Sequence, residues 1–123
     1  MLKKDIEKIL KWWRSRARGR IPVVSAVVCP MTSGILGNCE NVGGVFLDSA
    51  KFLIRISPTA GERTLFHELG HAWAAVNEKL AREITKTKIT EKWVTENEAW
   101  VNEYATIALK YWNEDTSGVL VCN

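Results

Sequence analysis

Two histidines stand four residues apart in the segment RTLFHELGHAW, which covers residues 63–73. His67 and His71 are the only histidines in the chain, and Glu68 directly follows the first of them. In an α-helix, side chains at positions i and i+4 project from one face, close enough to hold a single ion between them. These residues can therefore act together only in a helix, and this requirement constrains the fold more than any other feature of the sequence.

The segment around the histidines has the pattern of an amphipathic helix. Thr59 and Glu62 have the spacing of a capping box, so we expect the helix to begin there. Its predicted buried stripe repeats at helical spacing and consists of Leu65, Leu69, Ala72 and Val76. Gly70 costs a helix about 1 kcal/mol relative to alanine, so we expect it to make room beside the ion and a partner helix.

The histidine pair and its glutamate have the composition of a catalytic zinc site. Zn²⁺ binds neutral imidazole, and catalytic zinc usually takes three protein ligands and one water. Glu68 would lie beside that water, where a carboxylate can accept a proton and later pass it to a leaving amine. The HExxH pattern is short, and the alternative is two surface histidines beside a solvated glutamate.

A third ligand has to come from another residue type, because the chain has no third histidine. The last predicted helix runs from about Thr95 to about Trp112 and offers three glutamates, Glu96, Glu98 and Glu103. Only Glu98 falls within the apolar arc of that helix, where a carboxylate is costly unless it is paired or bound to a metal. We therefore predict Glu98 as the third ligand of one Zn²⁺ per chain. The alternative is that Thr95 and Glu98 form a capping box.

The segments RTLFHELGHAW and ENEAWVNEYA together resemble the gluzincin pattern HExxH…ExxxN, in the form found in ImmA/IrrE-type peptidases. The single-domain minigluzincins are similar in length. Glu98 stands at the glutamate ligand of this pattern and Asn102 at its asparagine, while Val101 replaces the usual alanine. The resemblance covers residues 51 to about 112. It implies a zinc-dependent endopeptidase that acts on a protein or peptide, with Glu68 as general base.

The resemblance also implies a compact, single-domain zincin-like α+β fold, with a small mixed sheet and helices packed on one face. The strand before the metal-binding helix, Lys51–Ile56, would be an edge strand that binds an extended peptide by strand addition. The residues assigned to this substrate edge are Phe52, Ile54 and Ile56.

Three further residues receive roles through the resemblance. Asn102 would orient a metal ligand. Tyr104 or Tyr111 is a candidate donor to the oxyanion, with packing in the core as the alternative for each.

The rest of the chain adds a strand and a hairpin. Residues 21–28, IPVVSAVV, are rich in β-branched side chains and predict a buried strand. Residues 29–44 are rich in glycine and asparagine and predict a loop. Val45–Leu47 and Phe52–Ile56 then predict a hairpin. The order helix, strands, helix, helix independently favours an α+β domain with its helices against one sheet.

The length of 123 residues fits one domain, 1–123, and the charge is concentrated at its beginning. Eight of the 17 basic residues lie in the first 20 positions, among apolar residues at helical spacing. Residues 1–20 thus predict a basic amphipathic helix that packs on the domain. The alternative is nucleic-acid contact or docking on an acidic partner. In that case the protein would be a regulatory or nucleic-acid-binding module with a structural or sensory zincin frame.

The cysteines Cys29, Cys39 and Cys122 lack CxxC spacing, which excludes a zinc knuckle and a full disulfide framework. Cys29 and Cys39 would bridge only in an oxidising compartment. Cys122 lies in the predicted tail 114–123, where a thiolate would be able to occupy the open position of zinc and keep a peptidase latent. The alternative is an idle or buried thiol. Since no apolar run fits a membrane span or a signal peptide, we expect a cytoplasmic protein.

Overall fold

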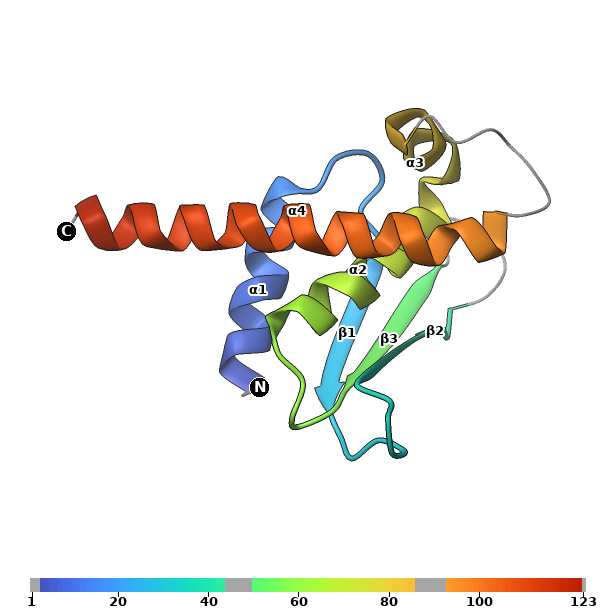
Figure 1. The fold of residues 1–123 in the computed structure, drawn as a ribbon, viewed down its shortest axis with the longest axis horizontal. Helices are drawn as coiled ribbons and strands as arrows, with labels where there is room; N and C mark the ends of the chain where they lie inside the picture. Colours follow the sequence, from blue (N-terminus) through green and yellow to red (C-terminus); the bar gives the residue numbers. More distant parts are fainter. Residues whose placement is uncertain (1–2, 44–49, 86–92, 123) are drawn as a thin grey trace.

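The computed structural model describes residues 3–43, 50–85 and 93–122, with only the backbone described at 82–85, 93–97, 99 and 116–122. Its elements follow in the order α1 (Lys3–Arg16), β1 (Val23–Val28), β2 (Gly37–Asn41), β3 (Lys51–Ile56), α2 (Glu62–Val76), α3 (Glu78–Thr85) and α4 (Trp93–Cys122). The described residues form a small α+β domain in which α4 lies across α2, with the sheet beyond it (Figure 1).

The three strands form one mixed sheet in the order β1-β3-β2. β3 is parallel to β1, with Val24 level with Phe52, and antiparallel to β2, with Cys39 level with Ile54. β3 alternates as expected for a strand that buries one face, because Phe52, Ile54 and Ile56 are 6%, 0% and 0% exposed. β1 is less buried than the sequence predicts, since it forms an edge and Val23 is 59% exposed.

The expectation that Lys51–Ile56 is an edge strand is wrong. β3 pairs along its whole length with β1 on one side and β2 on the other, so its main-chain groups have no room for an added peptide. The side chains of Phe52, Ile54 and Ile56 lie in the core and are equally inaccessible. A fully paired strand with one buried face is the expected place for such a run of large apolar residues.

The strand that displaces β3 from the edge is β2, which lies within the segment predicted as a loop. Its sequence, GNCEN, has poor strand propensity. Pairing with β3 overrides that propensity, and the Arg55 guanidinium adds an ion pair to Glu40 across the two strands at 2.8 Å. The other predicted hairpin strand, Val45–Leu47, lies outside the described residues.

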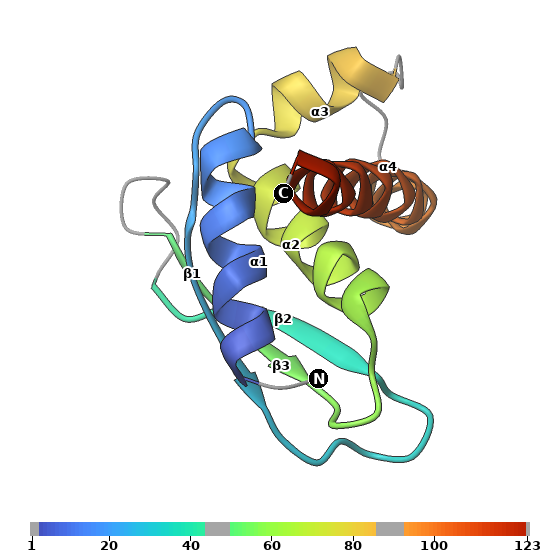
Figure 2. The same ribbon diagram turned by 90° about the vertical axis from the view of Figure 1, so that its left-hand side faces the viewer.

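α1 and α2 pack on one face of the sheet, and α4 packs on α2 (Figure 2). The four apolar residues predicted for the stripe of α2 are all buried, at 0–8% exposure: Leu65, Leu69, Ala72 and Val76. α1 buries Ile6, Ile9, Leu10 and Trp13 and leaves its lysines in solvent. A basic amphipathic helix that packs on the domain is therefore present over Lys3–Arg16, and it ends four residues before the predicted limit at residue 20.

Two helix boundaries differ from the prediction. α2 begins at Glu62 with Gly61 as its cap residue and no side-chain cap, because the Thr59 hydroxyl pairs with Ser57 at 3.0 Å instead. α4 continues to Cys122 rather than ending near Trp112, so the predicted tail 114–123 is helical over its described length. Asp115 stabilises this continuation by accepting hydrogen bonds from Trp12 at 2.7 Å and Arg16 at 3.0 Å.

Cys29 and Cys39 are free thiols on opposite sides of β3. The backbone amide of Cys29, at the end of β1, donates to the Ile56 carbonyl of β3. On the other side of β3, Cys39 of β2 pairs with Ile54. Two strand spacings amount to roughly 10 Å, beyond the Cα separation that a disulfide tolerates. A bridge between these cysteines is excluded by the strand order. The side chain of Cys122 is not described, so its predicted role in latency lies outside the structure.

Candidate metal centre

The residues predicted to bind metal come together between α2 and α4. The nitrogen or oxygen ligand atoms of His67, His71 and Glu98 all lie within 4.8 Å of one another. His71 Nε2 is 3.2 Å from His67 Nε2, and it is 2.8 Å from Glu98 Oε1. His67 Nε2 is 3.3 Å from Glu98 Oε2. Residues 31 positions apart in the chain, Glu98 and His67, thus meet at one point.

Two of the three separations fit a single tetrahedral zinc ion. Ligand atoms about 2.0–2.1 Å from zinc at tetrahedral angles lie roughly 3.3 Å apart. The two Nε2 atoms, at 3.2 Å, match this spacing, as does the 3.3 Å between His67 Nε2 and Glu98 Oε2. The 2.8 Å between His71 Nε2 and Glu98 Oε1 is a hydrogen-bond distance, which an ion between the two atoms would lengthen. Two imidazoles and one carboxylate also form a donor set typical of catalytic zinc. The three side chains therefore fit the metal that the sequence predicts.

Asn102 orients the first histidine. Its Oδ1 lies 3.0 Å from Nδ1 of His67. Because an amide oxygen only accepts, the matching tautomer has the proton on Nδ1, which leaves a lone pair on Nε2 for a metal. This is the arrangement that the sequence suggested for Asn102, one helical turn after Glu98.

The electrostatic environment favours neutral imidazole at His71. Burial is the largest influence and lowers the pKa of His71, while the Glu98 carboxylate acts in the opposite direction and His67 adds to the lowering. A neutral imidazole is the form that binds a metal ion. His71 is therefore in the form that a metal ion would require.

Glu68 lies at the base of the site and is almost completely buried, at 6% exposure. Its Oε1 is 4.0 Å from His67 Nε2. Burial, and secondly the negative charge of Glu98, raise the pKa of Glu68 to about 7. A carboxyl group with such a pKa can both accept and release a proton near neutral pH.

Glu98 is more exposed than the sequence predicts. Its side chain is 60% exposed, although it points at both histidines, so it faces solvent rather than the core. The capping-box alternative is also wrong, because α4 begins at Trp93 and encloses both Thr95 and Glu98.

Gly70 brings α2 and α4 close together, as its position in the helix predicts. A Cβ at this position would lie 2.9 Å from Tyr104 Cδ1 and 3.2 Å from Val101 Cγ1. The close approach allows Glu98 on α4 to reach the histidines on α2. The glycine therefore contributes to the site through helix packing.

The tyrosines are placed differently from the oxyanion role considered for them. The Tyr104 hydroxyl accepts a hydrogen bond from Trp13 Nε1 at 2.8 Å, and its ring stacks on Trp73. Burial raises the pKa of Tyr104 to about 12. Tyr104 thus packs in the core against α1. Tyr111 is 56% exposed on α4, two turns beyond Asn102.

Two residues near the site were not singled out from the sequence. Gly37 of β2 lies against α2, where a Cβ would be 2.8 Å from Thr64 Cγ2 and 3.2 Å from Glu68 Cγ. Arg63 donates from Nη2 to the Asn102 carbonyl at 3.2 Å. The sequence gives no signal for Gly37, because it lies in a segment predicted as a loop. Arg63 precedes His67 by one helical turn, so helical spacing could have placed it on the metal-binding face.

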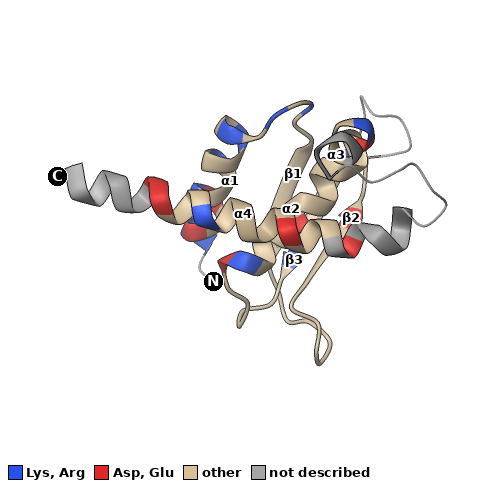
Figure 3. Ribbon diagram, turned by 45° about the horizontal axis from the view of Figure 1, so that its top comes forward, with Lys and Arg blue, Asp and Glu red and all other residues tan. Residues whose placement is uncertain are grey.

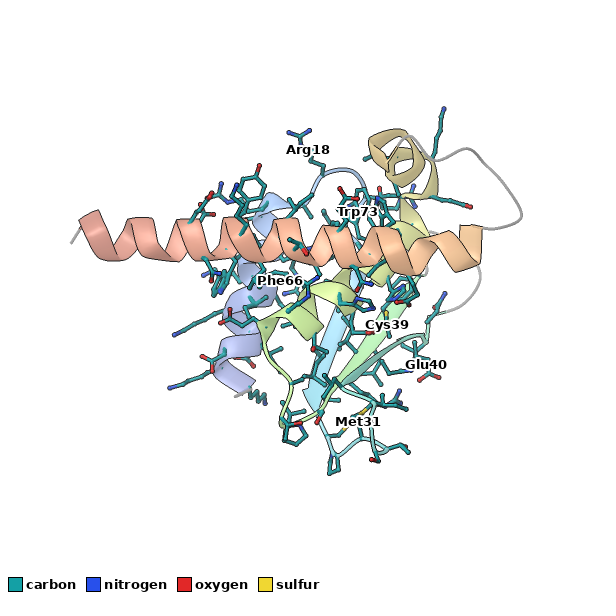
Figure 4. The ribbon with its side chains drawn as sticks, viewed as in Figure 1. Arg18, Met31, Cys39, Glu40, Phe66 and Trp73 are labelled. Carbon is teal, nitrogen blue, oxygen red and sulfur yellow. The ribbon has the colours of Figure 1, made fainter. Side chains whose placement is uncertain are left out.

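Cys39 of β2 also faces the helices, while its neighbour Glu40 lies on the outer face with Arg55 (Figure 4). Burial, and secondly the negative charge of Glu68, raise the pKa of the Cys39 thiol to about 12. The thiol is therefore protonated at neutral pH and is a poor metal ligand or nucleophile in this environment.

A scan of family models, a search of curated proteins and a search of solved structures each gave no match to this chain. The resemblance to gluzincins thus rests on the motif residues. Within the described ranges, no helix has both the length and the apolar character needed to cross a bilayer.

Proposed function

We propose that the protein is a zinc-dependent endopeptidase of the gluzincin type. The observation that carries this proposal is the convergence of His67, His71 and Glu98 at zinc-ligand spacing, with the buried carboxyl group of Glu68 beside them. A structural zinc site normally uses four protein ligands, whereas three ligands next to a buried carboxyl group are typical of a hydrolytic site.

The roles of the residues follow from their chemistry. Zinc held by His67, His71 and Glu98 supplies Lewis acidity that polarises a peptide carbonyl and acidifies water. Glu68 would accept the proton of the attacking water and pass it to the leaving amine, and its carboxyl group lies 4.0 Å from His67 Nε2. Asn102 keeps His67 in the tautomer that binds metal.

The peptide would add to β2 instead of β3. The Val42 amide bonds to Lys51 of β3, and the Leu36 carbonyl bonds to Ser57, the residue after β3. Because main-chain groups of alternate residues point to opposite sides of a strand, those of Gly37 and Cys39 point away from β3. Both residues lie close to Glu68. They are suitably placed to pair with an extended substrate.

The alternative function uses α1 to bind nucleic acid, and Figure 3 shows basic residues along this helix. Lys3, Lys4, Lys8 and Lys11 are exposed. Arg14 and Arg16 are engaged within the domain, with the Val24 carbonyl at 3.0 Å and with Asp115. The structure accounts for part of the basic character of α1 through packing, so we place the peptidase first.

One variant separates the two functions. Glu68→Gln should retain zinc and lose peptide cleavage, measured on a mixture of denatured proteins by mass spectrometry of the products. The matched control is Glu103→Gln, an exposed acidic residue of α4 outside the ligand set. Salt-dependent DNA binding that is lost in a Lys8→Gln, Lys11→Gln variant, without any cleavage by the wild type, would favour the alternative.

A further inference from the structure

Arg63 lies on the metal-binding face of α2 and has guanidinium donors beyond the one that bonds to the Asn102 carbonyl. It stands one helical turn before His67, about 6 Å along the axis of α2, and its side chain projects from the same face. The residue is exposed. Its Nη2 donates to the Asn102 carbonyl, while none of the ion pairs among the described side chains includes it. The remaining guanidinium donors are therefore available to an anion.

The direction of β2 determines which part of a substrate would meet Arg63. α2 and β2 run in broadly the same direction in both ribbon views (Figures 1 and 2). The first residue of β2, Gly37, lies beside Thr64, which is the neighbour of Arg63. A peptide antiparallel to β2 would therefore have its C-terminal side at the Arg63 end of α2. Antiparallel addition is the more favourable pairing.

From this placement, and resting on the proposed peptidase function, we propose that Arg63 binds a substrate carboxylate on the C-terminal side of the scissile bond. Arg63 precedes Glu68 by five residues, which is about 7.5 Å along the helix. An extended peptide covers this distance in about two residues. The carboxylate would thus belong to the first or second residue after the cleaved bond.

Two sources supply this chemistry. One is an aspartate or glutamate side chain within a longer chain, and the other is the free C-terminal carboxylate of a peptide that ends at that position. Either would accept paired hydrogen bonds from a guanidinium, a geometry that lysine cannot reproduce. Arg63 would then determine substrate choice without taking part in the chemical step.

The test uses the full-length, zinc-loaded protein and four peptides of one cleavable sequence. They carry glutamate or glutamine at the second position after the scissile bond, followed by more residues, or they end at that position with a free carboxylate or an amide. For the wild type we expect kcat/KM about 10- to 100-fold higher for a carboxylate peptide than for its neutral partner. Arg63→Gln should reduce that ratio to near one. Arg63→Lys should give a ratio between those of the wild type and Arg63→Gln.

The control variant is Lys79→Gln, an exposed cation on α3, which should leave the ratio unchanged. Zinc affinity and thermal midpoint, measured for each variant, report any loss of the bond to Asn102. A purely structural role of Arg63 would lower the cleavage rates of all four peptides equally. Wild-type cleavage without a preference, or a preference that persists in Arg63→Gln, would overturn the role of Arg63 and leave the peptidase intact.

Binding provides a second measurement that does not depend on turnover. Zinc-loaded Glu68→Gln, with and without Arg63→Gln, is titrated with the same fluorescently labelled peptides. Tighter binding of carboxylate peptides that is lost with Arg63 supports the proposal even if no cleavage is found. Absence of both cleavage by the wild type and carboxylate-dependent binding would overturn the peptidase function and the role of Arg63 together.

Discussion

The two sides of the candidate metal centre contribute different kinds of chemical group, side chains on one side and main-chain groups on the other. The side formed by α2 and α4 contributes side chains, with His67, His71 and Glu98 arranged at ligand spacing. The side formed by β2 contributes main chain, beginning with Gly37, which has no side chain. Reaction chemistry depends on residue type and is therefore visible in a sequence. A binding edge depends on strand order, which local sequence specifies weakly.

The largest expected effect comes from removing a metal ligand on the side formed by α2 and α4. His71→Ala and Glu98→Ala each remove one of three ligands, so metal affinity should fall by more than the roughly 10- to 100-fold that loss of a supporting hydrogen bond causes. Metal content per chain by mass spectrometry, together with competition by a chelator, measures the change. Glu103→Ala is the matched control on α4. Full zinc retention in Glu98→Ala would show that Glu98 is no ligand.

The next effect separates catalysis from metal binding on the same side. Glu68→Gln preserves shape and removes the proton acceptor, so kcat should fall about 10²- to 10⁴-fold. Zinc content should remain that of the wild type, since Glu68 is not among the three ligands. Steady-state kinetics on a peptide cleaved by the wild type gives the rate. Undiminished turnover in the variant would exclude Glu68 as the base.

The sequence predicts the α2–α4 side closely for a physical reason. The helical period places His67 and His71 on one face, and the spacing along α4 selects Glu98 among its glutamates. The expectation that Glu98 is a buried carboxylate in need of a partner is wrong, because its side chain is 60% exposed. Helical spacing gives the direction of a side chain but does not show how deeply a neighbouring helix covers it.

The β2 side was not predictable in the same way. GNCEN has the composition of a loop, and it becomes a strand only because β3 offers a row of main-chain partners. Lys51–Ile56 was expected at the edge because its position before the metal helix resembles the edge strand of zincins. Strand order depends on this long-range pairing, which no local pattern in the segment records.

The third effect uses pH to test the environment of Glu68 in the metal-free protein. The pKa of Glu68 is about 7 in the folded state, against an ordinary glutamate value of 4.5. Between these values the unfolded chain loses the proton while the folded protein keeps it, so stability falls as pH rises through this window. The difference between the two pKa values corresponds to roughly 3 kcal/mol.

The measurement is urea unfolding with chelator at pH 4.5 and pH 8, for the wild type and Glu68→Gln. The variant should gain stability relative to the wild type at the higher pH, because glutamine has no charge to bury. Contributions from His71 are common to both proteins and cancel in the difference. Parallel stability profiles of the two proteins would contradict a raised pKa at Glu68.

A smaller effect concerns the support of the metal ligands. Asn102→Ala removes the acceptor from Nδ1 of His67, and zinc affinity should fall about 10- to 100-fold. Asn102→Asp keeps an acceptor oxygen and serves as the conservative control, with affinity closer to that of the wild type. Competition with a fluorescent zinc chelator measures both. Equal affinity of the alanine variant and the wild type would mean that His67 needs no orienting partner.

The smallest effect tests the β2 side directly. Gly37→Ala places a Cβ 2.8 Å from Thr64 Cγ2, and the β-branched threonine has little freedom to move away. We expect the free energy of unfolding to fall by about 1 kcal/mol, at the lower end of the range for overpacking. The wild type is the reference for this variant. If Gly37→Ala unfolds at the same urea concentration as the wild type, β2 does not lie against α2 as closely as the structure shows. A specific loss for Gly37→Ala, accompanied by weaker peptide binding to zinc-loaded Glu68→Gln, would instead link this contact to the substrate edge that the sequence did not reveal.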